Sequence, residues 1–180
     1  GVTELDVRCS GSYSAREYCV QYRETDFAFV SRLMEEEGIF YFFEHAEGGE
    51  TLVLADTASA IKPVPGAAKV RLMVQEGSYL EEDVITEFVA EHAVHTGEVT
   101  LRHYDPLQPS TQLEGTVSGE GKQEHYDYPA KFTKIDDGNR YARLLLEQHE
   151  SLREVVRGSG NVRALTPGFR FDLTGHYRRE

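Results

Sequence analysis

A segment of mixed periodicity, ETDFAFVSRLMEEEGIFYFF at residues 24–43, places the tightest constraint on how this chain can fold. Its first half repeats apolar residues at the spacing of one helical face, at Phe27, Val30, Leu33 and Met34. Thr25 or Asp26 can cap the first turn by accepting hydrogen bonds from its unpaired amides. Gly38 can adopt the left-handed conformation that commonly follows a helix. We therefore predict a helix over residues 26–37.

Three consecutive acids, Glu35 to Glu37, occupy the last turn of this predicted helix. Negative charge at that end opposes the helix dipole. A local mismatch of this kind suggests that at least one of the acids is used in a contact elsewhere in the fold. We interpret the three residues as solvated or interface acids.

Five bulky residues, Ile39 to Phe43, come next and favour a strand that is covered on both faces. The glycine-containing turn EHAEGGE and the strand-like run TLVLAD follow it. We predict an antiparallel hairpin over residues 39–56. The bulky run suits a core within the chain or a core that continues into a neighbouring chain, and we favour the first.

The rest of the chain carries mostly strand signals and one further helix. Strands are predicted around residues 69–75, 83–94, 98–105, 117, 125–128, 155–160, 163–165 and 169–173. Residues 57–68 are predicted to form a loop. The second helix is expected from Asn139, a plausible cap, to about residue 153, with one apolar face formed by Tyr141, Leu144, Leu145 and Leu152. The predicted class is α+β with β dominant.

An excess of acids limits the possible partners. The chain has 19 Lys and Arg against 31 Asp and Glu, a net charge of −12. Such a surface repels phosphate backbones, so we expect no nucleic acid partner. No apolar run approaches the roughly 20 residues of a membrane-spanning helix, and the N-terminus shows no signal-peptide pattern. Both ends interrupt a strand-like pattern, so we expect a fragment of a longer chain.

Acid pairs offer one possible chemistry, that of a small acid-type hydrolase. The candidates are Glu35–Glu37 and Asp136–Asp137. Such an enzyme requires a cleft with two converging carboxylates and at least one raised pKa. Consecutive residues of a helix point about 100° apart, which favours solvated or interface acids over a catalytic pair.

Histidines and cysteines offer a second, weaker possibility. His92, His95 and His103 form the only local histidine cluster, and a strand would turn the first two to opposite sides. Cys9 and Cys19 have no activating neighbours in the sequence and are expected to be reduced thiols. We therefore expect no metal, no cofactor and no enzymatic activity.

The run REYCVQYRETDFAFVSRLMEEEGIFYFFEH at residues 16–45, followed by TLVLAD, resembles the VgrG spike proteins of bacterial type VI secretion systems. Those proteins are relatives of phage tail hub proteins. The resemblance continues through LRHYDPLQP at 101–109, EHYDYP at 124–129 and PGFRFDLTGH at 167–176. It covers nearly the whole chain in the order found in the family.

The resemblance implies two small antiparallel β-barrel-like hub domains with two helices, both barrels incomplete in this chain. Residues 1–80 would form the C-terminal part of the first hub barrel, with the helix 26–37 and the hairpin 39–56. Residues 81–180 would form the second hub region, with the helix at about 139–153, and would end before the spike barrel and needle. Open strand edges would then need pairing or covering.

The same resemblance implies a structural role at the base of a trimeric spike, which adapts the threefold spike to the sixfold Hcp tube. PAAR-type tip proteins and effectors would bind through regions that this chain lacks. The protein would reside in the bacterial cytoplasm during assembly and then be secreted through the type VI apparatus. A phage or phage-like tail hub is the alternative.

The most distinctive part of the shared motif supplies a set of candidate structural or interface residues, with no catalytic, cofactor or metal role. They are Gln21, Tyr22, Asp26, Arg32, Leu33, Glu36, Glu37, Gly38, Ile39, Tyr41 and Phe43. Two of them, Glu36 and Glu37, stand with Glu35 at the corner between the predicted helix and the following strand, where subunits could meet.

Overall fold

The computed structural model describes residues 2–73 and 82–176, and the chain divides into two compact units. Unit 1 comprises residues 1–88 and 158–180, and unit 2 comprises residues 89–157. The chain leaves unit 1 within strand β6 (Val84–His92) and returns to it within β10 (Glu154–Gly160). The first and the last parts of the chain therefore belong to the same compact unit.

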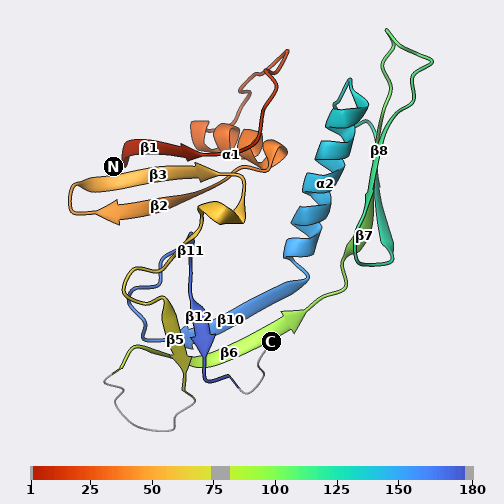
Figure 1. Ribbon diagram of the computed structural model, residues 1–180. Helices are drawn as coiled ribbons and strands as arrows, with labels where there is room; N and C mark the ends of the chain where they lie inside the picture. Colours follow the sequence, from red (N-terminus) through yellow and green to blue (C-terminus); the bar gives the residue numbers. More distant parts are fainter. Residues whose placement is uncertain (1, 74–81, 177–180) are drawn as a thin grey trace. The chain divides into compact units, whose positions relative to one another are not determined.

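Strands dominate the described residues, which contain two α-helices (Figure 1), so the α+β class is confirmed. Besides its parts of β6 and β10, unit 1 contains β1 (Val2–Arg8), α1 (Asp26–Glu37), β2 (Phe40–Ala46), β3 (Gly49–Ala55), the short 3-10 helix η1 (Ala58–Ala60), β4 (Lys62–Pro63), β5 (Lys69–Leu72), β11 (Phe169–Arg170) and β12 (Asp172–Thr174). Unit 2 contains β7 (Thr96–His103), β8 (Leu113–Ser118), β9 (Gln123–Asp127) and α2 (Ile135–Ser151).

Helix α1 begins and ends where the sequence predicts. Thr25 is extended, and its Oγ1 accepts a hydrogen bond of 3.2 Å from the amide of Ala28. Gly38 has φ 73°, and its amide donates to the carbonyl of Glu35 at 3.1 Å. No residue of α1 is buried, however, and Phe27 and Val30 of the predicted apolar stripe are 64% and 45% exposed. The apolar residues of the helix have the expected spacing, but other parts of the structure cover them only in part.

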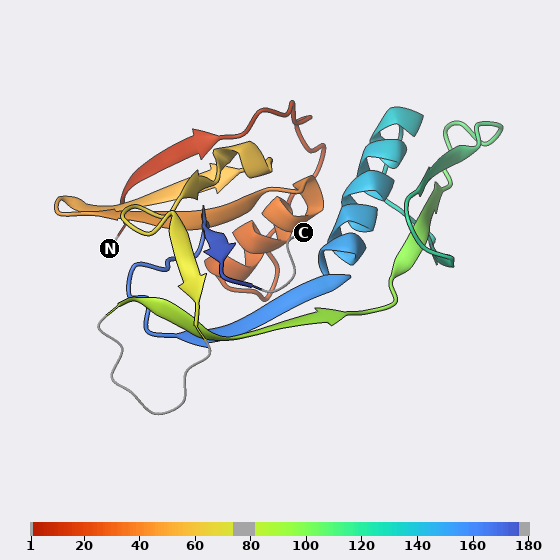
Figure 2. The same ribbon diagram turned by 60° about the horizontal axis from the view of Figure 1, so that its bottom comes forward.

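The predicted hairpin forms from β2 and β3, and β1 adds in parallel on the other side of β3, in the order β1-β3-β2 (Figure 2). Phe40 pairs with Ala55 and Phe42 with Val53, so these four residues share one face of the sheet. Phe42, Val53 and Ala55 are buried, and the Phe42 ring lies 6.0 Å from that of Phe169 on β11. This face is the core of unit 1.

The other strands of unit 1 form two further sheets, in the orders β10-β6-β5-β12 and β11-β4. β5 pairs in parallel with β6 and β12, and β4 pairs in parallel with β11. The expected antiparallel pairing is therefore found in part: β2 with β3 and β7 with β8 pair antiparallel, whereas these strands of unit 1 pair in parallel. In the described residues these sheets do not close into a barrel.

Unit 2 packs α2 against a sheet of order β8-β7-β9, as Figure 1 shows. Its core consists of Val99, Leu101, Leu113, Phe132, Ala142 and Leu146. A Cβ atom built on Gly115 of β8 would lie 2.3 Å from the carbonyl carbon of Gly138 in α2. The strand and the helix therefore touch through their backbones, at a point where both residues lack a side chain.

Helix α2 differs from the predicted second helix in its start and in its packed face. It begins at Ile135, before the predicted cap Asn139, and Asp136 and Asp137 stand in its first turn, where the helix dipole favours acids. Leu152 is 62% exposed and lies outside the packed face. The buried residues of the helix are Gly138, Ala142 and Leu146, with Tyr141 and Leu145 partly buried beside them.

The remaining strand predictions are confirmed with one exception. Residues 163 and 164 lie in a turn instead, next to which the Thr166 hydroxyl donates to the carbonyl of Ala164 at 3.3 Å. The predicted strand at 69–75 is observed as β5, and its last two residues lie outside the described part of the chain. The predicted loop at 57–68 contains η1 and β4.

A methyl group at Gly168 should destabilise unit 1. Gly168 has φ 85°, and a Cβ atom there would lie 2.2 Å from Cγ of the buried Phe42. We expect Gly168→Ala to lower the free energy of unfolding by about 3 kcal/mol or more, measured by urea denaturation. Gly66→Ala is the matched control, because Gly66 has φ 74° but no atom within 4 Å of its built Cβ, and should cost about 1–2 kcal/mol. Equal losses in the two variants would contradict the importance of the Phe42 contact.

Candidate interaction site

A segment that we call the arm, residues 9–24, joins β1 to α1. Asp56, directly after β3, holds the base of the arm. Its Oδ1 accepts from the amide of Ser10 at 2.9 Å, and its Oδ2 accepts from the amide of Gly11 at 2.6 Å and from the hydroxyl of Tyr13 at 2.9 Å. A Cβ atom on Gly11 would lie 3.0 Å from that Oδ2, so the absence of a side chain permits the close approach.

These hydrogen bonds set the protonation of the arm base. The amides of Ser10 and Gly11 lower the pKa of Asp56 to about 2. Burial, followed by the hydrogen bond to Asp56, raises the pKa of Tyr13, and burial raises the pKa of the Cys9 thiol. Near neutral pH the cluster therefore holds a carboxylate, a phenol and a thiol. It is a hydrogen-bonding centre without an activated nucleophile.

Arg16 ties the middle of the arm to the end of α1. Its Nη1 donates to Oε2 of Glu36 at 2.5 Å, and its Nη2 donates to Oε1 of Glu37 at 2.9 Å. A guanidinium at this point offsets the unfavourable placement of acids at the C-terminal end of a helix. The structure thus confirms that acids of the last turn serve a contact elsewhere in the fold.

Gln21 and Glu24 tie the last part of the arm to the start of α1. The Nε2 of Gln21 donates to Oδ1 of Asp26 at 2.7 Å and to the carbonyl of Glu24 at 3.1 Å. The Nη2 of Arg32 donates to Oε1 of Glu24 at 2.7 Å, and this contact lowers the pKa of Glu24. Polar groups of the arm are therefore directed back towards its own helix.

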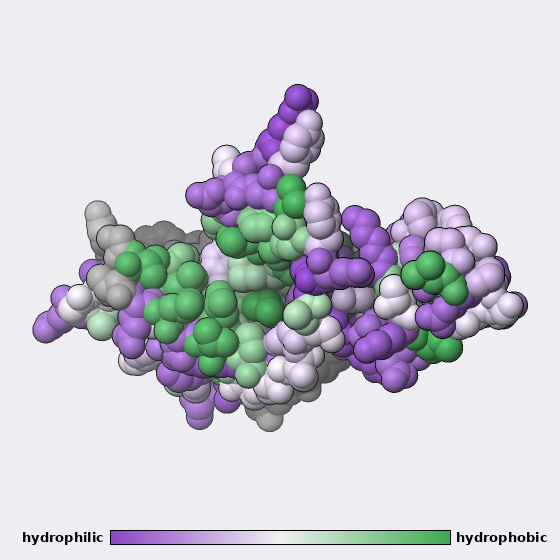
Figure 3. Space-filling model, turned by 90° about the horizontal axis from the view of Figure 1, so that it is seen from above, coloured by the Kyte–Doolittle hydropathy of each residue, from purple (hydrophilic) through white to green (hydrophobic). Residues whose placement is uncertain are grey.

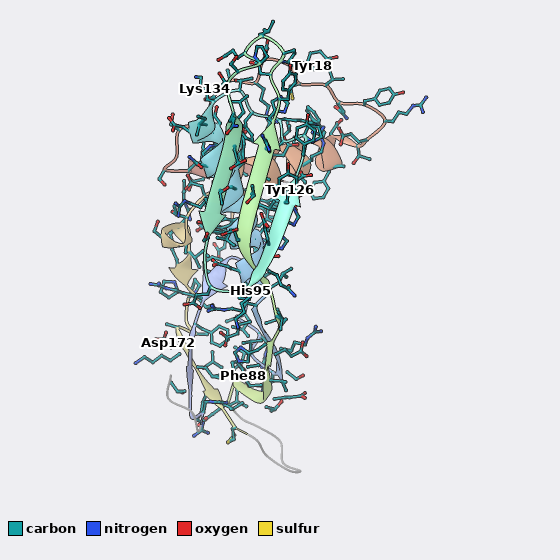
Figure 4. The ribbon with its side chains drawn as sticks, turned by 90° about the vertical axis from the view of Figure 1, so that its right-hand side faces the viewer. Tyr18, Phe88, His95, Tyr126, Lys134 and Asp172 are labelled. Carbon is teal, nitrogen blue, oxygen red and sulfur yellow. The ribbon has the colours of Figure 1, made fainter. Side chains whose placement is uncertain are left out.

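Apolar side chains of the arm are directed into solvent. Tyr18 is 83% exposed, Val20 47% and Tyr22 70%. Figure 4 marks Tyr18. The guanidinium of Arg23 lies 5.1 Å from the centre of the Tyr22 ring. Aromatic residues exposed to this extent are typical of surfaces that bind a partner.

A second apolar surface lies on the sheet face opposite the core of unit 1. The Tyr41 ring packs edge-on against Phe27 at 6.2 Å and against Phe43 at 6.1 Å. On β1, Leu5 and Val7 are 58% and 59% exposed. We call this surface the apolar face and define it by Leu5, Val7, Phe27, Val30 and Tyr41. Figure 3 shows apolar residues gathered in this region.

An ionic cluster joins three strands of unit 1. Arg8 on β1 donates to both carboxylate oxygens of Glu44 on β2, at 2.7 and 2.9 Å, and Lys62 on β4 donates to Glu44 at 3.1 Å. The guanidinium of Arg8 also lies 5.9 Å from the centre of the Phe42 ring. The cluster therefore fastens β1 and β4 to the hairpin.

The structure brings most of the candidate interface residues together around α1. Five of them donate or accept the side-chain hydrogen bonds described above: Gln21, Asp26, Arg32, Glu36 and Glu37. Gly38 caps the helix, Leu33, Ile39 and Phe43 are half-buried, and Tyr22 and Tyr41 are exposed. The sequence analysis did not predict the role of Asp56 or of its donors Ser10, Gly11 and Tyr13. The only local signal was the position of Asp56 as the acid that ends the run TLVLAD.

The acids proposed as a catalytic pair in α1 are used in an ion-paired contact. Glu36 and Glu37 both bind the guanidinium of Arg16. In the described part of the chain, no three His, Cys, Asp or Glu side chains gather in a group that could hold a metal ion. No helix within the described ranges has the length and apolar character needed to cross a membrane.

Loss of the Asp56 carboxylate should free the base of the arm. We expect Asp56→Ala to increase the rate of tryptic cleavage after Arg16 and Arg23 by about tenfold, because the amides at the base lose their acceptor and the arm opens more often. Gel electrophoresis and mass spectrometry would follow the cleavage. Asp172→Ala, at an exposed position of β12, is the control. An unchanged rate in Asp56→Ala would show that other contacts hold the arm.

Acid should weaken unit 1 through Glu44. Hydrogen bonding from Arg8, and less strongly from Lys62, lowers the pKa of Glu44 from 4.5 to about 2. A carboxyl group with a lowered folded-state pKa stabilises the fold above its unfolded-state pKa, and this contribution is lost as the pH falls towards the folded-state value. We expect Glu44→Gln to reduce the free energy of unfolding by about 1–2 kcal/mol at pH 7, and to flatten its decline between pH 4.5 and 2.

Urea denaturation at a series of pH values measures this effect. Glu47→Gln, at an exposed turn position, is the matched control and should leave both quantities unchanged. A Glu44→Gln variant with the pH profile of the unmodified chain would show that the ionic cluster does not contribute to stability.

Comparison with known proteins places these features in a family. The sequence model of the phage tail baseplate hub family (GPD) matches residues 2–180. The type VI secretion system spike proteins VgrG1b and VgrG1a of Pseudomonas aeruginosa are each 36% identical to this chain, over 100% and 99% of its length. These matches cover 25% and 28% of the two relatives, so the chain spans about a quarter of their length.

A solved structure supports the same relationship at the level of the fold. It is described as the E. coli c3393 protein, a component of the type VI secretion system with structural similarity to the T4 bacteriophage tail proteins gp27 and gp5. The TM-score is 0.62 with 18% identity, and the match covers 98% of this chain and 35% of the other. The family model and the relatives confirm the resemblance found in the sequence: this chain belongs to the phage tail baseplate hub family and is similar to the VgrG spike proteins of type VI secretion systems.

Proposed function

We propose that this chain is part of the base of a VgrG-type spike, and that its work is assembly without the making or breaking of covalent bonds. The observation that carries the proposal is the match to the hub family over residues 2–180, together with 36% identity to two proteins named as spike proteins. The site supports it as well, because the arm and the apolar face expose aromatic and aliphatic side chains, whereas Glu44 and Asp56 have lowered pKa values because hydrogen-bond donors hold their carboxylates in the charged form.

In this proposal the longer protein forms a homotrimer, and its base adapts the threefold spike to the sixfold Hcp tube. Residues 1–80 belong to the first hub barrel and residues 81–180 to the second hub region, with both barrels completed by parts outside this chain. PAAR-type tip proteins and effectors bind outside it too. The protein assembles in the bacterial cytoplasm and is then secreted through the type VI apparatus. The net charge of −12 opposes binding to nucleic acid.

The candidate interface residues enter this proposal in two roles. The polar ones, such as Gln21, Arg32 and Glu36, hold the arm and α1 in one arrangement, and the exposed Tyr22 and Tyr41 contact a partner. A fixed arrangement lowers the conformational entropy lost on binding, which favours assembly. Alanine at Tyr22 or Tyr41 would then weaken assembly without unfolding the chain, because both side chains are exposed.

A phage or phage-like tail hub is the second candidate function. It is favoured by the description of the matching family as a phage tail baseplate hub. The two functions share one physical role, the junction between a spike and a tube. Neighbouring genes for a sheath, Hcp and a membrane complex would indicate the secretion system, and neighbouring capsid genes would indicate a phage.

The mass of a spike-length protein in solution tests the proposal. We expect light scattering to give three copies per particle, and we expect the particle to bind Hcp rings in a co-sedimentation assay. The same assay with an unrelated acidic protein of similar charge is the control for non-specific binding. A spike-length protein that remains a monomer would contradict the proposed trimer.

A further inference from the structure

Unit 2 brings together two histidines that lie far apart in the sequence. His125 on β9 pairs with Val99 of β7, a core residue that packs with α2. Paired residues of adjacent strands share one face of a sheet, so His125 also faces α2. His149 lies in the last turn of α2, one turn after the partly buried Leu145. The centres of the two histidine rings are 5.0 Å apart, and the ring planes are inclined by 45°.

One nitrogen of this pair is buried without a partner. The Nε2 atom of His149 has almost no exposed surface, and none of the described residues forms a hydrogen bond with it. Native structures rarely leave a buried polar atom in this condition, and a bound ion is one of the explanations when they do. The His149 ring therefore has a free electron pair or a free N–H group that the rest of unit 2 does not use.

The separation of the two rings matches two imidazoles on one transition-metal ion. Zinc binds histidine nitrogen at about 2.0–2.1 Å, and two such bonds at a tetrahedral angle place the ring centres about 5 Å apart. Packing of the two rings without an ion also allows a distance of 5.0 Å. The unpartnered nitrogen of His149 is therefore the observation that favours a bound ligand over simple ring packing.

The surroundings of the pair suit a cation. The C-terminal end of a helix carries a partial negative charge, and His149 stands in the last turn of α2. The basic residue just beyond the helix, Arg153, is already paired with Glu120, with 2.6 Å between Nη1 and Oε2. The net charge of −12 also attracts cations to the chain. Neutral imidazole is a ligand that suits zinc, copper and nickel.

The pair supplies only two ligands. In the part of the chain that the structure describes, no third His, Cys, Asp or Glu joins them in a group that could hold a metal ion. An ion bound here therefore keeps water at its remaining positions, in contrast to the closed four-ligand sites of structural zinc domains. Both histidines are half-buried, which leaves one side of the pair accessible to solvent. Such a site exchanges its ion with the solution.

We propose that His125 and His149 together bind one divalent transition-metal ion, zinc being the type case, and that this ion fastens β9 to the last turn of α2. A ligand that binds the folded form alone stabilises that form. The ion then supports the end of α2 that lies farthest from its backbone contact with Gly115 of β8. This inference concerns unit 2 alone and does not depend on the proposed hub assembly.

Titration calorimetry of the untagged 180-residue chain with Zn²⁺ tests the site. We expect binding of one ion per chain at this site. Loss of an outer-shell partner of a metal ligand already weakens affinity about 10–100-fold. His125→Gln and His149→Gln, which each remove a ligand, should therefore weaken binding at least about tenfold.

Two matched controls separate this site from other zinc ligands of the chain. His45→Gln removes an exposed histidine of unit 1, and Cys19→Ser removes an exposed thiol. Neither variant should change the affinity of the site for zinc. Circular dichroism verifies that each variant keeps its fold.

Amide exchange of the unmodified chain locates the ion without any substitution. At a free zinc concentration of 100 times Kd, exchange by openings that release the ion should slow by up to about a hundredfold in β9 and in the last turns of α2. Exchange in the sheet of β1, β2 and β3 should not change. Absence of zinc binding, binding that both histidine variants retain in full, or unchanged exchange in β9 and α2 would overturn the inference.

Discussion

The arrangement of unit 1 depends on the need to cover both faces of the three-stranded sheet built on β3. Strand alternation sends Phe42 and Val53 into the core, where they are 4% and 0% exposed, and sends Tyr41 to the opposite side. The five bulky residues Ile39 to Phe43 therefore cannot all be buried by packing on one face of the sheet. On the second side the available cover is α1, a helix with no buried residue. The partial cover is the physical reason that an apolar surface of this chain faces solvent.

The ion pairs of the arm fix the position of the arm more than they stabilise the fold. Arg16, Glu24, Arg32 and Glu36 all lie near the surface, and exposed pairs of this kind stabilise a fold by about 0–1 kcal/mol each. Together with the amides bound to Asp56, they fix a segment that has no strand partner. A segment fixed before binding loses less conformational entropy when it meets a partner. The same contacts would be poor catalytic groups, because each carboxylate is held in its charged form by a donor.

Features that depend on neighbouring residues could mostly be predicted from the sequence, whereas features that depend on distant residues could not. The ends of α1 follow from Thr25 and Gly38, whose roles need only neighbouring residues, and the β2–β3 hairpin follows from one glycine-containing turn. The start of α2 was predicted too late because local propensity disfavours a glycine inside a helix. Gly138 is tolerated there since the Phe132 ring fills the space, 2.5 Å from a built Cβ. The parallel pairing of β5 with β12 and the role of Asp56 depend on residues distant in the sequence, which no local pattern reveals.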